Sequence, residues 1–454
     1  MKPRHECAVF GIKSDSDVFD KIYFGLYSMQ HRGQESAGIA TFSDKIDVHR
    51  EMGLVSEVFK GVYLEGKSGI GHVRYSTTGE SGIENAQPLT INYAGGSFAI
   101  AHNGNLINSK ELRDELEKKG SVFTTTTDTE IIAQLIVQEH LRSGDFMEGL
   151  KEAMKQLRGA YCLVILKDEE IIAIRDPWAV HPMVLGKSKD SYVVASESCA
   201  LDTVDIPLVR DIKPGEILVI GDELKSYSIG TEKISRCMFE YVYFARADSV
   251  LDGINVYDVR KNLGRTLHKE APVTADLTTA VPDSGITTAI GYSRESKIPY
   301  GESLMKNRYL GRTFIMPEQK EREVGVKLKL NPIKSEIKGK KIVLADDSIV
   351  RGTTVRNLIN LLRTAGAKEV HVRISCPPVK HPCFYGIDMQ TEEEFIASNK
   401  SVKDICKEIG ADSLAYTSLE GLIKAIGIPK KNLCLACLTG DYPIKEEQTK
   451  LKVE

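Results

Sequence analysis

The sequence predicts two structural units: a layered α+β domain over residues 7–230 and an α/β domain with a parallel sheet over residues 231–454. Two observations support this division. In the first half, short strand-like runs alternate irregularly with long amphipathic segments, without strict βαβ order. In the second half, a strand, a loop, a helix and another strand follow in direct succession. The sequence pattern changes from the first kind to the second near residues 225–237.

The strand-like runs of the first half are short and apolar. They cover residues 8–12, 98–101, 162–166, 171–174 and 192–195. Apolar residues recur with helical spacing over residues 18–29, 110–118 and 129–142. Long helices between many short strands predict sheets that are covered by helices.

The second half contains one well-marked βαβ unit. A strand is expected over residues 340–345, a helix over about residues 354–365 that ends at Gly366, and a further strand over residues 370–375. A weaker strand-like stretch covers residues 276–280. Because a helical crossover joins parallel strands, this unit predicts a parallel sheet.

The composition is that of an ordinary globular protein, with 42% apolar and 27% charged residues. A net charge of −3 gives no broad attraction to nucleic acid or to an anionic membrane, so an anionic ligand needs a local site. We find no apolar run of 18 residues and no secretory signal in the polar residues 1–6. We therefore expect a cytoplasmic protein whose nine cysteines are reduced, catalytic or metal-binding.

Two adjacent carboxylates, Asp346 and Asp347, stand where the predicted strand ends, and ligands of open α/β sheets bind at that edge. The following residues open a helix, whose N–H groups and dipole favour phosphate. The carboxylates could bind sugar hydroxyls and Mg²⁺. The alternative is an acidic turn followed by a helix N-cap. The residues after the carboxylates are Ser348, Ile349, Val350, Arg351, Gly352, Thr353 and Thr354.

This run resembles the phosphoribosyl pyrophosphate motif of type I phosphoribosyltransferases. Residues 281–285 resemble the turn that supports the pyrophosphate and presents Ser284 to the metal. Residues 306–313, with Lys306 and Arg308, resemble the flexible loop that closes over the substrate. The alternative for this loop is a solvated surface segment.

Cys7 precedes the first strand, and in isolation it would be interpreted as a small core residue. Four segments change that interpretation, because together with Cys7 they resemble the αββα glutaminase domain of the N-terminal-nucleophile amidotransferases. They are residues 30–38, 71–77, 101–106 and 127–130. A thiol needs a base at neutral pH, and the α-amino group of the same residue can serve. This requires removal of residues 1–6 as a propeptide.

The resemblance implies a role for each polar residue of the glutaminase half. Asn103 and the Gly104 N–H would form the oxyanion hole. Arg74 would hold the α-carboxylate of glutamine, and Asp128 would accept from its α-amino group. The alternatives are a type I′ hairpin turn at Asn103-Gly104, a surface ion pair at Arg74 and a helix N-cap at Asp128.

Cys434 and Cys437 form a C-x-x-C pair, which by spacing alone could be a zinc site, a redox pair or chance. Residues 7–443 as a whole resemble the glutamine phosphoribosylpyrophosphate amidotransferases. The cluster-bearing branch of that family binds a [4Fe–4S] cluster through four cysteines, which match Cys237, Cys383, Cys434 and Cys437. Two departures from the family are Ala8 in place of glycine and His181 in place of arginine.

The resemblance implies the first committed step of purine (IMP) synthesis. Phosphoribosyl pyrophosphate, glutamine and water would give 5-phosphoribosylamine, glutamate and pyrophosphate, with ammonia channelled between the two sites. It also implies Mg²⁺, a homotetramer and inhibition by purine nucleotides. One alternative is another N-terminal-cysteine amidotransferase such as glucosamine-phosphate synthase, which lacks the run of residues 346–354. Another is a non-catalytic phosphoribosyl-pyrophosphate-binding regulator of DNA, which would need a basic face or a helix-turn-helix.

Overall fold

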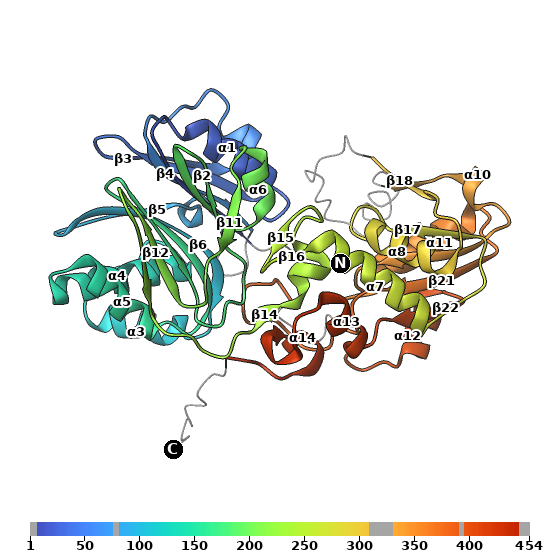
Figure 1. Ribbon diagram of the computed structural model, residues 1–454. Helices are drawn as coiled ribbons and strands as arrows, with labels where there is room; N and C mark the ends of the chain where they lie inside the picture. The colour runs from blue at the N-terminus through green and yellow to red at the C-terminus, as the bar shows by residue number, and fades with distance from the viewer. Residues whose placement is uncertain (1–6, 76–80, 308–329, 390–394, 445–454) are drawn as a thin grey trace, which may run out of the picture.

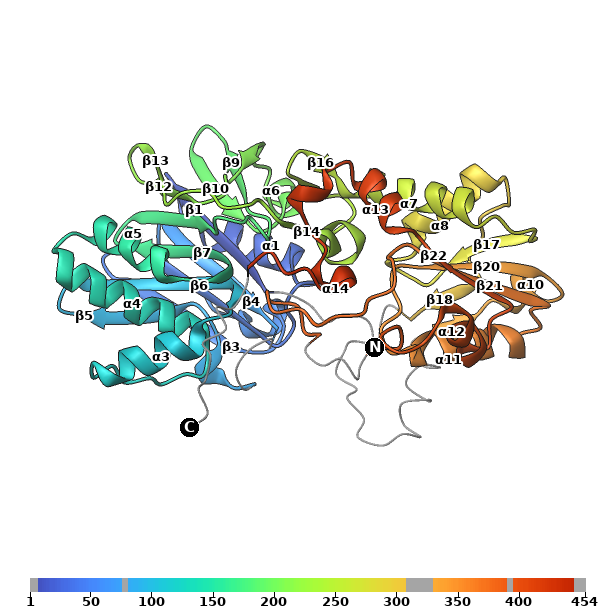
Figure 2. The same cartoon turned by 90° about the horizontal axis from the view of Figure 1, so that it is seen from below.

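The computed structural model describes residues 7–75, 81–307, 330–389 and 395–444. Two units lie side by side, the blue-to-green one carrying the first strands and the yellow-to-orange one carrying the later strands (Figure 1). The same arrangement is seen from below in Figure 2. Short elements lie between the units: β14 (Arg236–Cys237), β15 (Val250–Leu251), β16 (Ile254–Asn255), α13 (Leu419–Ile426) and α14 (Ala436–Thr439).

The first unit contains two antiparallel sheets. The seven-stranded sheet has the order β11 (Leu208–Asp211), β9 (Val184–Lys187), β10 (Ser191–Ala195), β1 (Ala8–Ser14), β4 (Ser68–Arg74), β2 (Ser36–Phe42) and β3 (Ile46–Met52). The six-stranded sheet has the order β13 (Leu224–Ser228), β12 (Glu216–Ile220), β8 (Glu170–Arg175), β7 (Gly159–Lys167), β6 (Gly96–Leu106) and β5 (Leu89–Tyr93).

Alternation along the strands builds four layers. In β1, Val9 packs between the two sheets, whereas Phe10 packs against the helices α1 (Phe19–Ser28) and α6 (Ser198–Thr203). In β6, Ala101 faces the other sheet. Ile100 faces the helices of the opposite layer, which are α3 (Ser109–Lys118), α4 (Asp128–Ser143) and α5 (Phe146–Gln156). The αββα prediction is confirmed.

The second unit is built on a parallel sheet of order β17 (Leu277–Ala280), β20 (Lys341–Asp346), β21 (Glu369–Ile374) and β22 (Ser413–Tyr416). Val343 of β20 packs on one face, which α7 (Val256–Glu270) and α8 (Ile286–Ser296) cover. Its neighbour Leu344 packs on the other, against α11 (Thr353–Thr364) and α12 (Val402–Ile409). The predicted α/β unit with a parallel sheet is confirmed.

A continuous apolar core joins the two units. β14 pairs in parallel with β23 (Leu433–Cys434), so the chain returns at its end to the place where the second half begins. The core around this pair includes Val180 of the first unit and Phe239, which precedes the π-helix η2 (Glu240–Phe244). The remaining elements are α2 (Val55–Val58), η1 (Ile83–Asn85), β18 (Leu304–Lys306), β19 (Leu330–Pro332), α10 (Lys334–Ile337) and η4 (Lys430–Asn432).

None of the helices in the described ranges is long and apolar enough to cross a membrane.

Candidate active sites and cysteine pocket

Cys7 lies directly before β1 and is 9% exposed. Its thiol donates to the carbonyl oxygen of Tyr75, with 3.6 Å between Sγ and O. Burial raises the pKa of Cys7 to about 11, although the Tyr75 contact and the Arg74 charge act in the opposite direction. The thiol is therefore protonated at neutral pH and needs a base to become a nucleophile.

Arg74 ends β4 and forms an ion pair with Glu35, with 2.8 Å between Nη1 and Oε1. Arg74 does form an ion pair, as the alternative expected, but the pair is largely buried beside Cys7 rather than at the surface. Arg74 favours the thiolate of Cys7 and Glu35 opposes it. Glu35 received no role from the sequence, although it lies within the segment 30–38 that supported the resemblance.

Asn103 and Gly104 both lie inside β6, so the hairpin-turn alternative is wrong. Asn103 is two residues beyond Ala101 and therefore shares its face, which points into the layer between the sheets. Among the described residues, its buried Nδ2 has no hydrogen-bond partner. An unsatisfied buried amide is costly, and this donor is free to bind a ligand that enters the layer between the sheets.

Gly104 is held in a backbone conformation that favours glycine, with φ of 147°. A Cβ at this position would lie 2.0 Å from the carbonyl oxygen of Ala160 on β7. The neighbouring strand therefore passes too close for any other residue. The close approach fixes the backbone of β6 beside Asn103.

Gly104→Ala is expected to destabilise the protein by more than the roughly 1–3 kcal/mol of backbone strain alone, because the β7 backbone must also move. Gly96→Ala is the matched control: it lies on the same strand, also with positive φ (108°), but its Cβ would meet only the distant Lys167 Nζ at 3.9 Å. Denaturant midpoints of the two variants test this difference. Equal destabilisation would contradict the steric argument.

Asp128 is the first residue of α4, and Thr127, not Asp128, occupies the N-cap position. Its Oδ2 accepts from the backbone N–H of Leu106 at 3.0 Å, and its Oδ1 lies 3.3 Å from Nδ1 of His102. Burial alone would raise the pKa of Asp128, but His102 and the Leu106 N–H outweigh it and lower the pKa. The carboxylate is therefore ionised and anchored to the end of β6.

In the second unit, two turns after neighbouring parallel strands meet. Asp346 ends β20, and Asp347 accepts hydrogen bonds from the hydroxyls of Ser348 (2.7 Å) and of Ser284 in the turn after β17. Gly352, with φ of 76°, is the N-cap of α11. The two carboxylates therefore lie at the end of β20 and in the turn that follows it, before the N-cap of α11.

Lys306 lies at the end of β18, and its Nζ is 2.5 Å from Oδ2 of Asp283 in the same turn. The contact places the start of the segment 306–313 beside the turn that carries Ser284. A pocket lies here, lined by Thr279, Ala280, Pro282, Asp283, Ile286, Tyr300, Glu302, Leu304, Met305 and Lys306. Arg308 lies outside the described residues.

The four cysteines from distant segments line one pocket, together with His181 and Tyr385. Cys237 and Cys434 face each other in the β14–β23 pair, and the backbone N–H of Lys380 donates to the Cys437 carbonyl at 2.9 Å. Burial raises the pKa of Cys434 to about 12. Cys237 and Cys437 are 200 residues apart in the sequence, and the fold brings them to the same pocket.

Within the described ranges, no three histidine, cysteine, aspartate or glutamate side chains are close enough to hold one metal ion. Thiolates around one tetrahedral zinc ion, with Zn–S bonds of about 2.3 Å, would be that close. A four-iron cluster separates its thiolates more widely, because each ligates a different iron. Sites of four cysteine thiolates suit zinc and iron–sulfur clusters alike.

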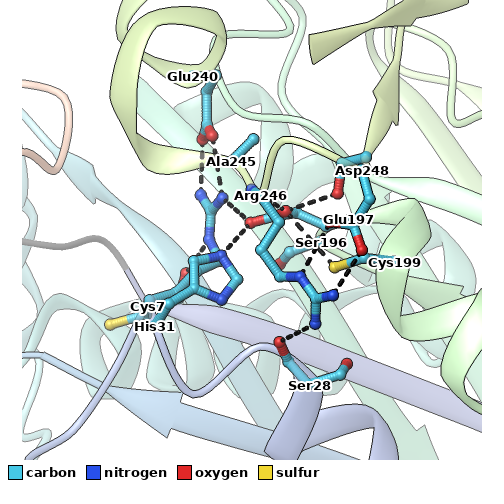
Figure 3. A network of polar contacts seen from close by, with 12 residues as sticks. Cys7, Ser28, His31, Ser196, Glu197, Cys199, Glu240, Ala245, Arg246 and Asp248 are labelled. Carbon is cyan, nitrogen blue, oxygen red and sulfur yellow. Dashed lines mark hydrogen bonds and ion pairs between the residues drawn. The ribbon is translucent and has the colours of Figure 1, made fainter. Parts of the chain in front are cut away.

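The polar network nearest to Cys7 received no role from the sequence. Arg32 donates from Nε to the Cys7 carbonyl at 3.2 Å and binds Glu197 and Glu240 with its other nitrogens. Figure 3 shows this network, with the Cys7 sulfur pointing away from it. Arg32 lies in the segment 30–38 and could have been singled out there, but nothing in the sequence pairs it with Glu240.

Two family models match the chain. A glutamine amidotransferase domain matches residues 72–203, and a phosphoribosyl transferase domain matches residues 255–386. Together with the two sites, these matches define the class: a glutamine-dependent phosphoribosyltransferase.

Relatives match over nearly the whole length. Amidophosphoribosyltransferase of Methanocaldococcus jannaschii is 53% identical and covers 96% of this chain and 97% of its own. The Bacillus subtilis amidophosphoribosyltransferase is 50% identical, covering 96% and 94%. A solved structure, the glutamine phosphoribosylpyrophosphate amidotransferase from B. subtilis complexed with ADP and GMP, is 48% identical. It superposes with a TM-score of 0.92 over 98% of each chain.

The chain belongs to the amidophosphoribosyltransferase family. The expected enzyme class, a transferase of purine biosynthesis that uses glutamine, is confirmed. The alternatives of a glucosamine-phosphate synthase and of a non-catalytic regulator are not supported.

Proposed function

We propose that this chain hydrolyses glutamine at Cys7 and passes the ammonia to phosphoribosyl pyrophosphate bound at residues 346–354. The products are glutamate, 5-phosphoribosylamine and pyrophosphate, in the first committed step of purine synthesis. The observation that carries this proposal is the environment of Cys7. Its buried thiol lies near the charged side chains of Arg74 and Asp128. It also lies in the same layer between the sheets as the Asn103 amide, which has no hydrogen-bond partner among the described residues. In this proposal, residues 7–230 hydrolyse glutamine and residues 231–454 transfer the ammonia to the sugar.

In the glutaminase step, Arg74 binds the α-carboxylate of glutamine and Asp128 its α-ammonium group. The α-amino group of Cys7 takes the thiol proton as Sγ attacks the amide carbon. Asn103 Nδ2 and the Gly104 N–H stabilise the oxyanion. Ammonia then departs, and water hydrolyses the thioester that remains on Cys7.

The mature protein is expected to begin at Cys7, because an amide nitrogen at position 7 cannot accept the thiol proton. Residues 1–6, which lie outside the described residues, would be absent from active enzyme. Intact mass and N-terminal sequencing of active protein test this expectation. Full glutamine-dependent activity in a chain that still begins at Met1 would overturn the amine-base mechanism.

At the second site, Asp346 and Asp347 bind the ribose hydroxyls, and the N–H groups of residues 348–354 bind the 5-phosphate at the start of α11. Lys306 and Arg308 reach the pyrophosphate. Asp346, Asp347 and Ser284 fit Mg²⁺, which is usually held by one or two carboxylates together with substrate phosphates. Mg²⁺ would neutralise charge on the departing pyrophosphate.

Ammonia must cross from Cys7 to the sugar without meeting bulk water, which would dilute or protonate it. The apolar core that joins the two units would keep bulk water away from such a route. Closure of the 306–313 loop, described here only for Lys306 and Asn307, would complete it once phosphoribosyl pyrophosphate is bound.

The cysteine pocket would hold a [4Fe–4S] cluster through Cys237, Cys383, Cys434 and Cys437, as in the iron–sulfur branch of the family. Such a cluster would cross-link three distant segments of the chain.

Anaerobically purified protein is expected to be brown and to contain about four irons and four sulfides per chain. Cys437→Ser should lose iron and lower the melting temperature. Cys406→Ser is the matched control, because Cys406 is half-buried in α12 and does not line the pocket. Iron content and visible absorbance decide the matter, and a colourless protein with one zinc per chain would overturn the cluster.

The homotetramer, inhibition by purine nucleotides and a cytoplasmic location are further proposals. The complex of the B. subtilis relative with ADP and GMP supports nucleotide binding. Light scattering and inhibition by adenine and guanine nucleotides test the first two.

A further inference from the structure

Arg32 joins the residue that carries the nucleophile to two carboxylates. Its side chain is 1% exposed. Nε donates to the Cys7 carbonyl at 3.2 Å, Nη1 donates to Glu197 at 2.7 Å, and Nη1 and Nη2 form a fork with Glu240 at 2.9 and 2.6 Å. All five donors of a guanidinium sit in one plane, so fixing the two carboxylates also fixes the direction of the Nε bond to Cys7.

Glu197 and Glu240 come from different parts of the fold. Glu197 is the N-cap residue of α6 in the first unit, whereas Glu240 opens η2 in the segment between the units. Both side chains are buried. Figure 3 shows Glu240 at the top of the network, on the side opposite Cys7. Thus one of the two carboxylates that bind Arg32, Glu240, lies outside the first unit.

The position of Glu240 is set by the second unit. Arg260 of α7 donates to the carbonyl oxygens of Tyr241 (3.0 Å) and Ala245 (2.7 Å), which fastens both ends of η2. Burial lowers the pKa of Arg260 to about 10, and Asp347 of the proposed sugar site counteracts this shift. The carboxylate that orients Arg32 is therefore held by a helix of the phosphoribosyltransferase unit.

We infer that Glu240 is a positioning residue for Cys7: through Arg32 it fixes the Cys7 backbone, and so the place of Sγ and of the α-amino group relative to Asn103. Glu240 does not touch the reacting atoms. This inference rests on the proposed function of Cys7. Small displacements of reacting groups are costly, since a misplacement of about 1 Å can reduce a rate by roughly a hundredfold.

Glu240→Gln tests the inference because it keeps the size of the side chain and removes the charge that binds the guanidinium fork. We expect kcat for the glutamine-dependent reaction to fall by about tenfold or more. The KM for glutamine should stay within about twofold, because Arg74 and Asp128 bind glutamine. Ammonia-dependent synthesis should be unchanged. A merely structural residue would lower both activities together.

Glu216→Gln is the matched control. Glu216 is equally buried and forms a two-pronged pair with Arg210, at 2.7 Å to each nitrogen, on β12 away from Cys7. It should reduce stability without changing the ratio of the two activities. A similar change of that ratio in Glu216→Gln would overturn the specific role of Glu240.

Arg32→Lys interrupts the same connection from the other side and keeps the positive charge. If Glu240 acts through Arg32, the double variant should be no worse in glutamine kcat than Arg32→Lys alone. Additive losses in the double variant would overturn the inference. If Glu240→Gln does not fold, Arg32→Lys alone is the test, and an unchanged kcat with glutamine in that variant would overturn the inference. The proposed function fails separately, if Cys7→Ala keeps glutamine-dependent synthesis.

Discussion

Cys7→Ala is expected to abolish glutamine-dependent synthesis, by more than about a thousandfold, and to leave ammonia-dependent synthesis intact. The thiol is the only nucleophile in the proposed glutaminase mechanism, whereas the sugar site lies in the other unit and accepts ammonia from solution. Alanine should be well tolerated, since Cys7 has a small buried side chain whose thiol donates to the Tyr75 carbonyl. Rates with saturating glutamine and with an ammonium salt measure the two activities.

Cys406→Ala is the control for cysteine removal, and both of its activities should equal those of the unaltered protein. Loss of both activities in Cys7→Ala would mean that the two sites are not separable. Retention of both would place the nucleophile elsewhere.

Asp347→Ala is expected to reduce glutamine-dependent and ammonia-dependent synthesis alike, by at least about a hundredfold. Its carboxylate is almost fully buried and organises the hydroxyls of Ser284 and Ser348, which come from two different turns. Its removal takes away a ligand of the sugar or of Mg²⁺ and also releases the contact between the turns. Steady-state rates with both nitrogen sources measure the effect.

Asp258→Ala, an exposed carboxylate on α7 of the same unit, is the control and should retain both activities. Melting temperatures separate loss of the site from loss of the fold. An Asp347→Ala enzyme with normal ammonia-dependent synthesis would move the sugar site away from β20.

Local pattern predicted some of the central elements of each unit. The expected strand at residues 8–12 is observed as β1, the helix at 129–142 as α4, and the helix at 354–365 as α11. Such elements follow from periodicity within a short window. The carboxylates of β20 were also within reach, because the edge of a parallel sheet gathers ligands.

The supports of Cys7 could not be found in this way. Arg32 and Glu240 are 208 residues apart, and Arg32 and Glu197 are 165 apart. No local period relates them, and a buried charge pair is visible only once its partners are placed. The resemblance assigned roles to residues expected to touch substrate, whereas Glu240 contacts Cys7 only through Arg32.

The β14–β23 pair has a consequence for how the molecule is made. The strands of both antiparallel sheets are complete by Ser228, so a nascent chain can fold the first unit while the rest is still being synthesised. Cys237 meets Cys434 only when the last segment leaves the ribosome. The first unit can therefore fold early, whereas the β14–β23 pair that joins it to the second unit forms only after residue 434 has been synthesised. If residues 1–6 are removed as proposed, removal after the units have joined would keep ammonia from being released before its acceptor site is in place.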